Sequence, residues 1–312
     1  MNFVTVTPNP SLDRTLEIDR LTRGAVVRAT GSRVEAGGKG VNVARALVAH
    51  GHRAKAVLPV GGAEGDHLTR LLHELGLETR PVPISASVRS NVSVIEPDGT
   101  VTKLNAPGPR LTADEVDGLS KTVVAELDGV DWVVASGSLP PGVPDDFYAR
   151  LAADVHAAGV RIAIDTSGAP LEVALAARPD VCKPNDEELA AAVGRELSTF
   201  GEVVEAAQEF RRRGAAAVLV SLGRHGALLV DGQQASHAET PPLVPLSNVG
   251  AGDATLSGFL AAGGQGPDAL RQAVAWGAAA VRLPGTAMPT PGDVDVDVVR
   301  VDVVDPDRSL RD

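Results

Sequence analysis

Short apolar segments alternate with longer segments of helical periodicity along most of this chain. Compact apolar runs indicate buried strands, and apolar residues that recur every three or four positions indicate helices. Strands are predicted at 3–7, 54–60, 132–135, 161–165, 218–222 and 227–230. Helices are predicted at 39–50, 65–75, 112–127, 145–158, 203–213 and 267–283, and a further helix starts at Ala254. The repeated strand–helix order predicts an α/β fold with a mostly parallel sheet between helices on both faces.

Each of two segments, 16–34 and 88–103, contains alternating strand patterns and no helical pattern. Pro97-Asp98-Gly99 is a turn signal, so 92–102 is predicted to form a hairpin. We expect a small β lid, built from about 12–34 and 88–105, as an appendage of a single domain spanning 1–312. The alternation of aspartate and valine in 293–305 predicts an exposed edge strand rather than a calcium loop, which would need a glycine and a bidentate glutamate.

Composition narrows the class of protein. The chain has 312 residues, of which 44% are hydrophobic and 3% aromatic, so valine, leucine and alanine must build its core. Its net charge of −11 argues against a nucleic-acid partner. Cys182 is the only cysteine, which suits a reducing compartment. The first residues lack the pattern of a signal peptide and no apolar run has membrane-spanning length, so we expect a cytoplasmic protein without a membrane partner.

The segment Gly250-Ala251-Gly252-Asp253 directly precedes a helical pattern. A small-residue turn at a helix start offers free N–H groups and the positive end of the helix dipole, which together bind anions. Asp253 in such a turn has two interpretations: it caps the helix, or it is a base beside a transferring phosphate. No Walker loop or complete dinucleotide fingerprint is present in the chain.

Two further segments suit a phosphorylated, polyhydroxylated ligand. The glycines of Gly37-Gly38-Lys39-Gly40 let a ligand approach the backbone closely, and Lys39 supplies a cation. Asn42 adds an amide, which can donate and accept hydrogen bonds, at the start of the predicted helix. The alternative is an ordinary strand-to-helix turn with a solvated lysine. Asp13 is predicted in a polar turn after the first strand, where it could accept hydrogen bonds from sugar hydroxyls or simply form an Asx turn.

The segment Lys183-Pro184-Asn185 begins another helix, with Glu188 three residues after Asn185. The Asn185–Glu188 pair could hold Mg²⁺ through waters, or form a capping box, and both can hold at once. The turn from Ser221 to Gly226 could admit a nucleotide. The seven histidines show no metal-ligand spacing.

Taken together and in this order, these segments resemble the PfkB (ribokinase-like) family of carbohydrate kinases over essentially the whole chain. Residues 37–44 are similar to the family's N-terminal signature and 248–253 to its C-terminal signature. Residues 7–13, 103–109 and 136–142 are similar to the branch that acts on phosphorylated sugars, which holds 1-phosphofructokinase, tagatose-6-phosphate kinase and a 6-phosphofructokinase. The resemblance implies a ribokinase-like three-layer α/β/α sandwich and an ATP-dependent sugar-phosphate kinase, nearest to 1-phosphofructokinase.

The resemblance also implies roles for single residues. Asp253 would be the general base, beside an anion hole of Gly250, Ala251 and Gly252. The sugar phosphate would be bound by Asp13, Gly37, Gly38, Lys39, Asn42, Arg89, Lys103 and Ser138, and by Arg28 across a homodimer that pairs through the lids. ATP would be bound by Lys183, Asn185, Ser221, Gly223 and Gly226, with Mg²⁺ near Asn185 and Glu188. Carbonyls at Val249 and Gly285 would bind K⁺.

Three alternatives stay open from the residues. The sugar phosphate could be tagatose 6-phosphate or fructose 6-phosphate. An unphosphorylated sugar or nucleoside is disfavoured by Arg89 and Lys39. A non-catalytic sugar-phosphate sensor is disfavoured by the intact Asp253 and its glycine turn, because a sensor has no need of a base.

Overall fold

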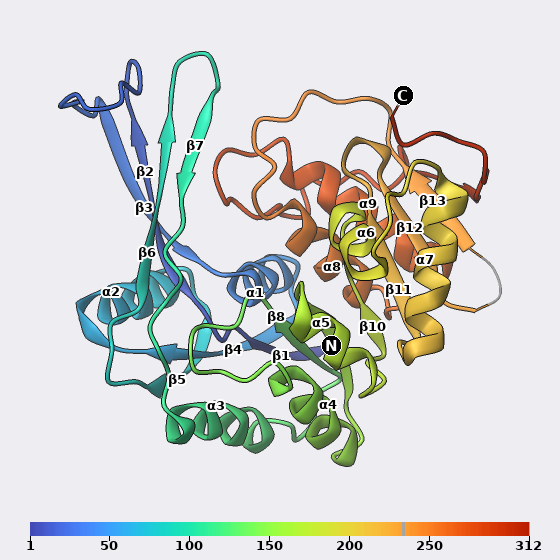
Figure 1. The fold of residues 1–312 in the computed structure, drawn as a ribbon, viewed down its shortest axis with the longest axis horizontal. Helices are drawn as coiled ribbons and strands as arrows, with labels where there is room; N and C mark the ends of the chain where they lie inside the picture. Colours follow the sequence, from blue (N-terminus) through green and yellow to red (C-terminus); the bar gives the residue numbers. More distant parts are fainter. Residues whose placement is uncertain (233–234, 312) are drawn as a thin grey trace.

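A sheet of ten strands forms the centre of the computed structural model, which describes residues 1–232 and 235–311 (Figure 1). Its strand order is β14-β13-β12-β11-β10-β9-β8-β1-β4-β5. The strands from β11 to β5 are parallel, and β12, β13 and β14 add to one edge in antiparallel fashion. Their bounds are β1 Asn2–Val6, β4 Arg53–Val60, β5 Glu78–Pro83, β8 Trp132–Ser136, β9 Arg161–Asp165, β10 Val181–Cys182, β11 Ala217–Ser221, β12 Ala227–Val230, β13 Ala235–Glu239 and β14 Arg300–Val303.

Helices cover both faces of this sheet because successive strand residues point to opposite sides. Phe3 packs in the core with α1 (Lys39–Ala49), α2 (Gly62–Glu74), α8 (Ala251–Ala261) and α9 (Gly266–Ala280), whereas its neighbour Val4 packs on the other face. That second face is covered by α3 (Ala113–Ala125), α4 (Phe147–Ala157), α5 (Ala169–Leu175), α6 (Asp186–Val193) and α7 (Phe200–Arg213). The predicted three-layer α/β/α fold is confirmed.

A second sheet has the order β3-β2-β6-β7, and its ribbons project from one side of the molecule (Figure 1). It consists of β2 (Ser11–Glu17), β3 (Gly31–Gly37), β6 (Arg89–Ile95) and β7 (Val101–Leu104). These strands come from the two segments predicted to form the lid, and β6 and β7 form the predicted hairpin. One detail of the prediction was wrong: β2 begins at Ser11, so Asp13 lies within a strand rather than in a turn.

Several elements differ from the sequence pattern. Strand β5 was missed because it contains Pro81 and Pro83, and proline is tolerated only because β5 is an edge strand. The short elements β10, β13 and α5 were also missed. The predicted strand at 293–305 is present only as the edge strand β14; residues 293–299 form turns, in which Val294 and Val296 pack against the core. Among the described residues, no helix has the length and apolarity needed to span a bilayer.

Strand β1 lies between β4 and β8, so the chain leaves it first toward one side of the sheet and later toward the other. In open α/β sheets, ligands bind outside the carboxyl ends of the strands at such a switch point. The segments that follow β1 and β8 meet there: Asn9 Nδ2 donates to Ser138 Oγ at 3.1 Å. A ligand site is therefore expected at the carboxyl ends of β1 and β8.

Candidate active site

Gly250 is the N-cap residue of helix α8, and its φ of 81° is a left-handed conformation that favours glycine. The N–H groups of Ala251, Gly252 and Asp253 have no acceptor within their own helix, because they belong to its first turn. The start of α8 has no side-chain cap. Asp253 is instead buried, and its Oδ2 accepts a hydrogen bond from Asn42 Nδ2 at 2.8 Å. The capping interpretation of Asp253 is therefore wrong.

The environment of Asp253 changes its acidity. Burial raises the pKa of Asp253 to about 6, and the nearby carboxylate of Asp165 acts in the same direction. The ammonium groups of Lys39 and Lys183 and the hydrogen bond from Asn42 oppose this rise. The result is a carboxylate whose pKa lies near neutral pH, at a helix start with free N–H groups, which is the combination that a general base for phosphoryl transfer requires.

Two lysines converge on one carboxylate beside Asp253. Lys39 Nζ lies 2.8 Å from Asp165 Oδ1, and Lys183 Nζ lies 3.2 Å from Asp165 Oδ2. Burial opposes the ionisation of Asp165, but Lys183 and Lys39 outweigh it and lower the pKa of Asp165. Burial likewise disfavours a charged Lys39, yet Asp165, Glu188 and Asp253 raise its pKa. Lys39 was predicted to bind the sugar phosphate and Lys183 to bind ATP, so their shared contact with Asp165 places the two predicted sites next to each other.

Asp165 was not predicted as a site residue, although the sequence contains a sign of its role. It is the last residue of the buried parallel strand β9, and a carboxylate at the carboxyl end of such a strand lies where α/β sheets bind ligands. Lys183 also reaches the anion-binding turn: a Cβ placed on Gly252 would lie 3.3 Å from Lys183 Nζ. A cation thus lies directly beside the free N–H groups of α8.

The predicted capping box at the start of α6 is confirmed. Glu188 N donates to Asn185 Oδ1 at 2.6 Å, and Asn185 N donates to Glu188 Oε2 at 2.9 Å. Glu188 Oε1 faces the active site instead, 3.8 Å from Lys39 Nζ. Asn185 also forms a parallel bridge with Ser221, which places the end of β11 beside this helix start.

The turn after β11 contains the other predicted nucleotide residues. Gly223 begins a short 3₁₀ turn, and Gly226 closes it with a φ of 76°. A side chain at Gly226 would collide with the carbonyl of Ala238 on β13. The glycine at 226 is therefore explained by backbone packing, and the nucleotide role of Ser221, Gly223 and Gly226 stays a prediction.

The glycines before α1 also have a structural reason. A Cβ on Gly38 would lie 2.6 Å from Thr7 Cγ2, and one on Gly40 would lie 2.5 Å from Thr7 Oγ1. A side chain at Gly37 would collide with the carboxylate of Asp13. These glycines let α1 start directly against the end of β1, which brings Lys39 and Asn42 to the site.

On the lid, Asp13 is fixed by its neighbours. Asp13 Oδ1 accepts from Ser11 Oγ at 2.7 Å and from Asn91 Nδ2 at 2.9 Å. Asn91 lies opposite Asp13 on β6 and was not predicted to take part in the site. Because these bonds hold only one oxygen of the half-buried carboxylate, Asp13 is well placed to accept from a hydroxyl with the other.

Arg89, at the start of β6, is half-buried and donates to two carbonyls, Ala106 O at 2.7 Å and Asn9 O at 2.9 Å. Burial lowers the pKa of Arg89, and Asp13 opposes this effect. Arg89 thus joins the lid to the segments after β1 and β7. Lys103 on β7, Ser138 after β8 and Arg28 between β2 and β3 are exposed.

Val249 and Gly285 are linked through one hydroxyl. Ser247 Oγ donates to Gly285 O at 2.8 Å and accepts from Val249 N at 3.2 Å. The two segments predicted to contribute K⁺-binding carbonyls are therefore adjacent. Among the described residues, no cluster of three or more histidine, cysteine, aspartate or glutamate side chains is arranged to bind a metal.

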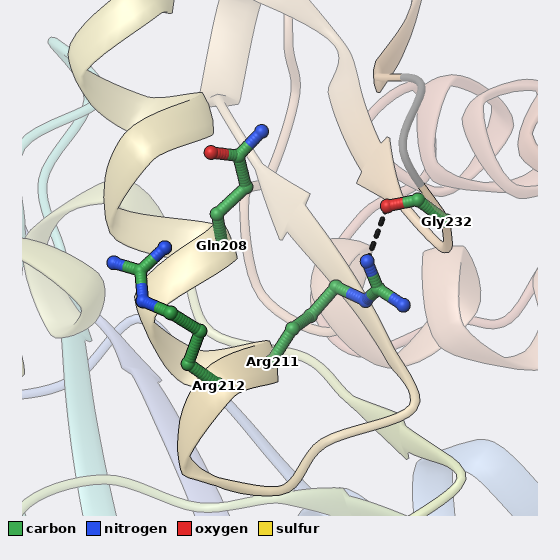
Figure 2. A pocket seen from close by; sticks show the side chains of 4 residues that line it. All are labelled: Gln208, Arg211, Arg212 and Gly232. Carbon is green, nitrogen blue, oxygen red and sulfur yellow. Dashed lines mark hydrogen bonds between the residues drawn. The ribbon is translucent and has the colours of Figure 1, made fainter.

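A surface hollow elsewhere on the molecule is unrelated to this cluster. It is lined by Gln208, Arg211, Arg212 and Gly232, and Arg211 donates to the carbonyl of Gly232 (Figure 2). These residues lie near the amino end of β11, at the edge of the sheet opposite to the cluster.

Comparison with known proteins agrees with this geometry. Residues 7–292 match the pfkB family of carbohydrate kinases. The chain is 40% identical to the 1-phosphofructokinase of Rhodobacter capsulatus, covering 93% of this chain and 94% of that protein. It is 37% identical to the ATP-dependent 6-phosphofructokinase isozyme 2 of Escherichia coli K12, over 92% and 95% of the two chains. The solved structure of the E. coli phosphofructokinase-2 in complex with potassium superposes with a TM-score of 0.89 at 36% identity, covering 94% and 96%.

Proposed function

The chain belongs to the pfkB family of carbohydrate kinases, and we propose that it is a 1-phosphofructokinase, which transfers the γ-phosphoryl group of ATP to fructose 1-phosphate. The observation that carries this proposal is the buried Asp253, hydrogen-bonded to Asn42 at the uncapped start of α8. The name of the Rhodobacter capsulatus relative supports the choice of substrate.

In the proposed reaction, Asp253 accepts the proton of the attacking hydroxyl as the new P–O bond forms and the bond to ADP breaks. A positioned base contributes roughly 10²–10⁴-fold to such a step. The N–H groups of Gly250, Ala251 and Gly252 point toward the charge that grows on the transferred phosphoryl group, as an anion hole. Lys183 and Lys39, which both pair with Asp165, add positive charge to the site.

Asn185 and Glu188 are proposed to hold Mg²⁺ beside the phosphates of ATP. Their donor set fits this ion, because Mg²⁺ prefers oxygen ligands and keeps several waters. Glu188 uses Oε2 in the capping box, and its other oxygen faces Lys39 and the site. When bound, Mg²⁺ neutralises the charge of the phosphates. The turn with Ser221, Gly223 and Gly226 is proposed to bind the nucleotide, and the carbonyls at Val249 and Gly285 a K⁺ ion.

The sugar phosphate is proposed to bind between the lid and the body. Asp13 accepts from a sugar hydroxyl, and Lys39 and Arg89 bind the existing phosphate with help from Lys103 and Ser138. Gly37 and Gly38 let the ligand approach the backbone. We further propose a homodimer in which the lids pair and Arg28 reaches the partner's site, because Arg28 lies exposed in the lid segment between β2 and β3.

A second candidate is a 6-phosphofructokinase, since the E. coli isozyme 2 is nearly as similar as the Rhodobacter capsulatus enzyme. The test is kcat/KM with ATP and each of fructose 1-phosphate, fructose 6-phosphate and tagatose 6-phosphate. We expect the highest value with fructose 1-phosphate. A higher value with either 6-phosphate would reassign the substrate, and binding of all three without turnover would indicate a sensor.

A further inference from the structure

Arg45 lies one helical turn after Asn42 on α1, and none of the proposed roles includes it. Its guanidinium Nη1 lies 3.5 Å from Asn42 Oδ1. Residues three apart on a helix lie on the same face, so the two side chains are held side by side by α1 itself. Arg45 therefore faces the amide that binds the proposed base.

The orientation of the Asn42 amide decides how it acts on Asp253. Its Nδ2 donates to Asp253 Oδ2, and its Oδ1 faces Arg45. If the amide turned over, its oxygen would face the carboxylate, and two acceptors would repel each other. A cation beside Oδ1 favours the productive orientation. Arg45 is therefore placed to act on Asp253 through Asn42.

The carboxylate of Glu35 on β3 acts electrostatically on Arg45. Burial lowers the pKa of Arg45, and the Glu35 carboxylate opposes this effect. Glu35 is itself fixed: Thr286 Oγ1 donates to its Oε1 at 3.0 Å, and Arg33 Nε donates to its Oε2 at 3.3 Å. In the lid sheet, Glu35 lies directly opposite Asp13, the proposed sugar ligand.

We infer that Arg45 is a positioning residue which, together with Glu35, fixes the Asn42 amide and so couples the seating of the lid to the proposed base Asp253. The inference rests on the proposed kinase function. Sugar bound at Asp13 orders β2 and β3, Glu35 then stays beside Arg45, and Asn42 keeps its N–H group on Asp253.

Apart from the interactions among Glu35, Arg45 and Asn42, three charged groups shift the pKa of Asp253. Asp165 on β9 raises its pKa, and Lys39 on α1 and Lys183 after β10 lower it. Substitution of Arg45 leaves all three in place. A change in the pKa of Asp253 in such a variant would therefore report on the Asn42 amide and the lost Arg45 charge.

The test compares Arg45→Met, Arg45→Lys and the control Arg150→Ala. Methionine keeps the aliphatic stem of the half-buried side chain, and Arg150 is an exposed residue of α4 paired with Asp146. We expect Arg45→Met to lower kcat about 10-fold while KM for the sugar phosphate changes less than about 2-fold. The acid limb of kcat/KM should move to higher pH, Arg45→Lys should recover most of kcat, and Arg150→Ala should match the wild type.

A second readout needs no turnover, which separates the inference from the proposed function. The folded-state pKa of Asp253 can be followed as the pH above which the Tm difference between Asp253→Asn and its parent stops growing, measured in the wild-type and Arg45→Met backgrounds. We expect this pH to be higher in the Arg45→Met background. If the wild type had no kinase activity but the pKa of Asp253 still differed between the two backgrounds, the kinase assignment would be overturned, and the effect of Arg45 on Asp253 through Asn42 would stand.

Two results would overturn the inference. One is an Arg45→Met enzyme whose kcat and pH profile match those of Arg150→Ala. The other is a loss of kcat that Arg45→Lys does not recover and that comes with no change in the pH profile, because this pattern indicates packing alone. Glu35→Gln keeps the size of the side chain beside Thr286 and should lower kcat in the same direction, with little further loss when combined with Arg45→Met.

Discussion

At the scale of single residues, Asp253 combines two properties that conflict in most buried carboxylates. It is shielded from water, which raises its pKa to about 6, yet it must be ionised to accept a proton. A base with this pKa is largely ionised at neutral pH and still strong enough to take a proton from a hydroxyl whose acidity rises during attack. Its burial therefore costs stability and serves the proposed reaction.

This cost predicts the pH dependence of stability. The pKa of Asp253 is raised in the folded protein from 3.8 to about 6, so wild-type stability falls as pH rises through this window. Asp253→Asn removes the buried charge. We expect its Tm to match that of the wild type at about pH 3.5, below the unfolded pKa, and to exceed it by about 2–6 °C at pH 8, measured by calorimetry.

Asp117→Asn serves as the control, because Asp117 is exposed on α3 and pairs with Lys121 in the next turn. Its Tm difference from the wild type should be small at both pH values. A Tm for Asp253→Asn that is lower than the wild type at pH 8 would show that the carboxylate stabilises the fold.

At the scale of elements, Glu188 at the start of α6 has a structural role in the capping box and a proposed role in Mg²⁺ binding, and one substitution can distinguish the two. Glu188→Gln keeps an oxygen that can accept from Asn185 N, so the capping box survives, but the negative charge disappears. If Glu188 holds Mg²⁺, the half-saturating free Mg²⁺ should rise about 10-fold, while Tm stays within about 2 °C.

The matched control is Glu115→Gln, since Glu115 closes an equivalent capping box with Thr112 at the start of α3. It should leave the Mg²⁺ requirement unchanged. Equal Mg²⁺ requirements for the two variants would limit Glu188 to its role in the helix cap.

The helices and strands also show which parts of the fold could be predicted from the sequence. The longer buried parallel strands and amphipathic helices were predictable because burial imposes their periodicity, whereas the two-residue β10 and the seven-residue α5 are too short to show one. Strand β5 was not predictable, because its prolines mimic a loop and only its edge position permits them. Asp13 was expected in a turn because nothing local shows that β2 pairs with both β3 and β6.

At the scale of the whole molecule, the site exists only because distant segments meet. Asn42 and Asp253 are 211 positions apart and share a hydrogen bond. Lys39 and Asp165 are 126 positions apart and form an ion pair. The sequence motifs identified residues that take part in these contacts, but they did not show which residues contact each other. For that reason Asp165, Asn91 and Arg45 emerged only from the structure, whereas Asp253, Lys39 and Asn185 were predicted.

The same arrangement gives the lid and the body separate proposed roles. The proposed sugar ligands lie on the lid and at the carboxyl ends of the central strands, and the proposed base and anion-binding turn lie at the start of α8. Closure of the lid on the sugar would exclude water from the transferring phosphoryl group and limit hydrolysis of ATP.

The most direct test of the account is ADP formation from ATP and fructose 1-phosphate by the wild type and by Asp253→Asn, with ATP binding measured in parallel. We predict turnover by the wild type, and a fall in kcat of about 10²–10⁴-fold in Asp253→Asn with ATP affinity nearly unchanged. Near-normal kcat in Asp253→Asn would contradict the account.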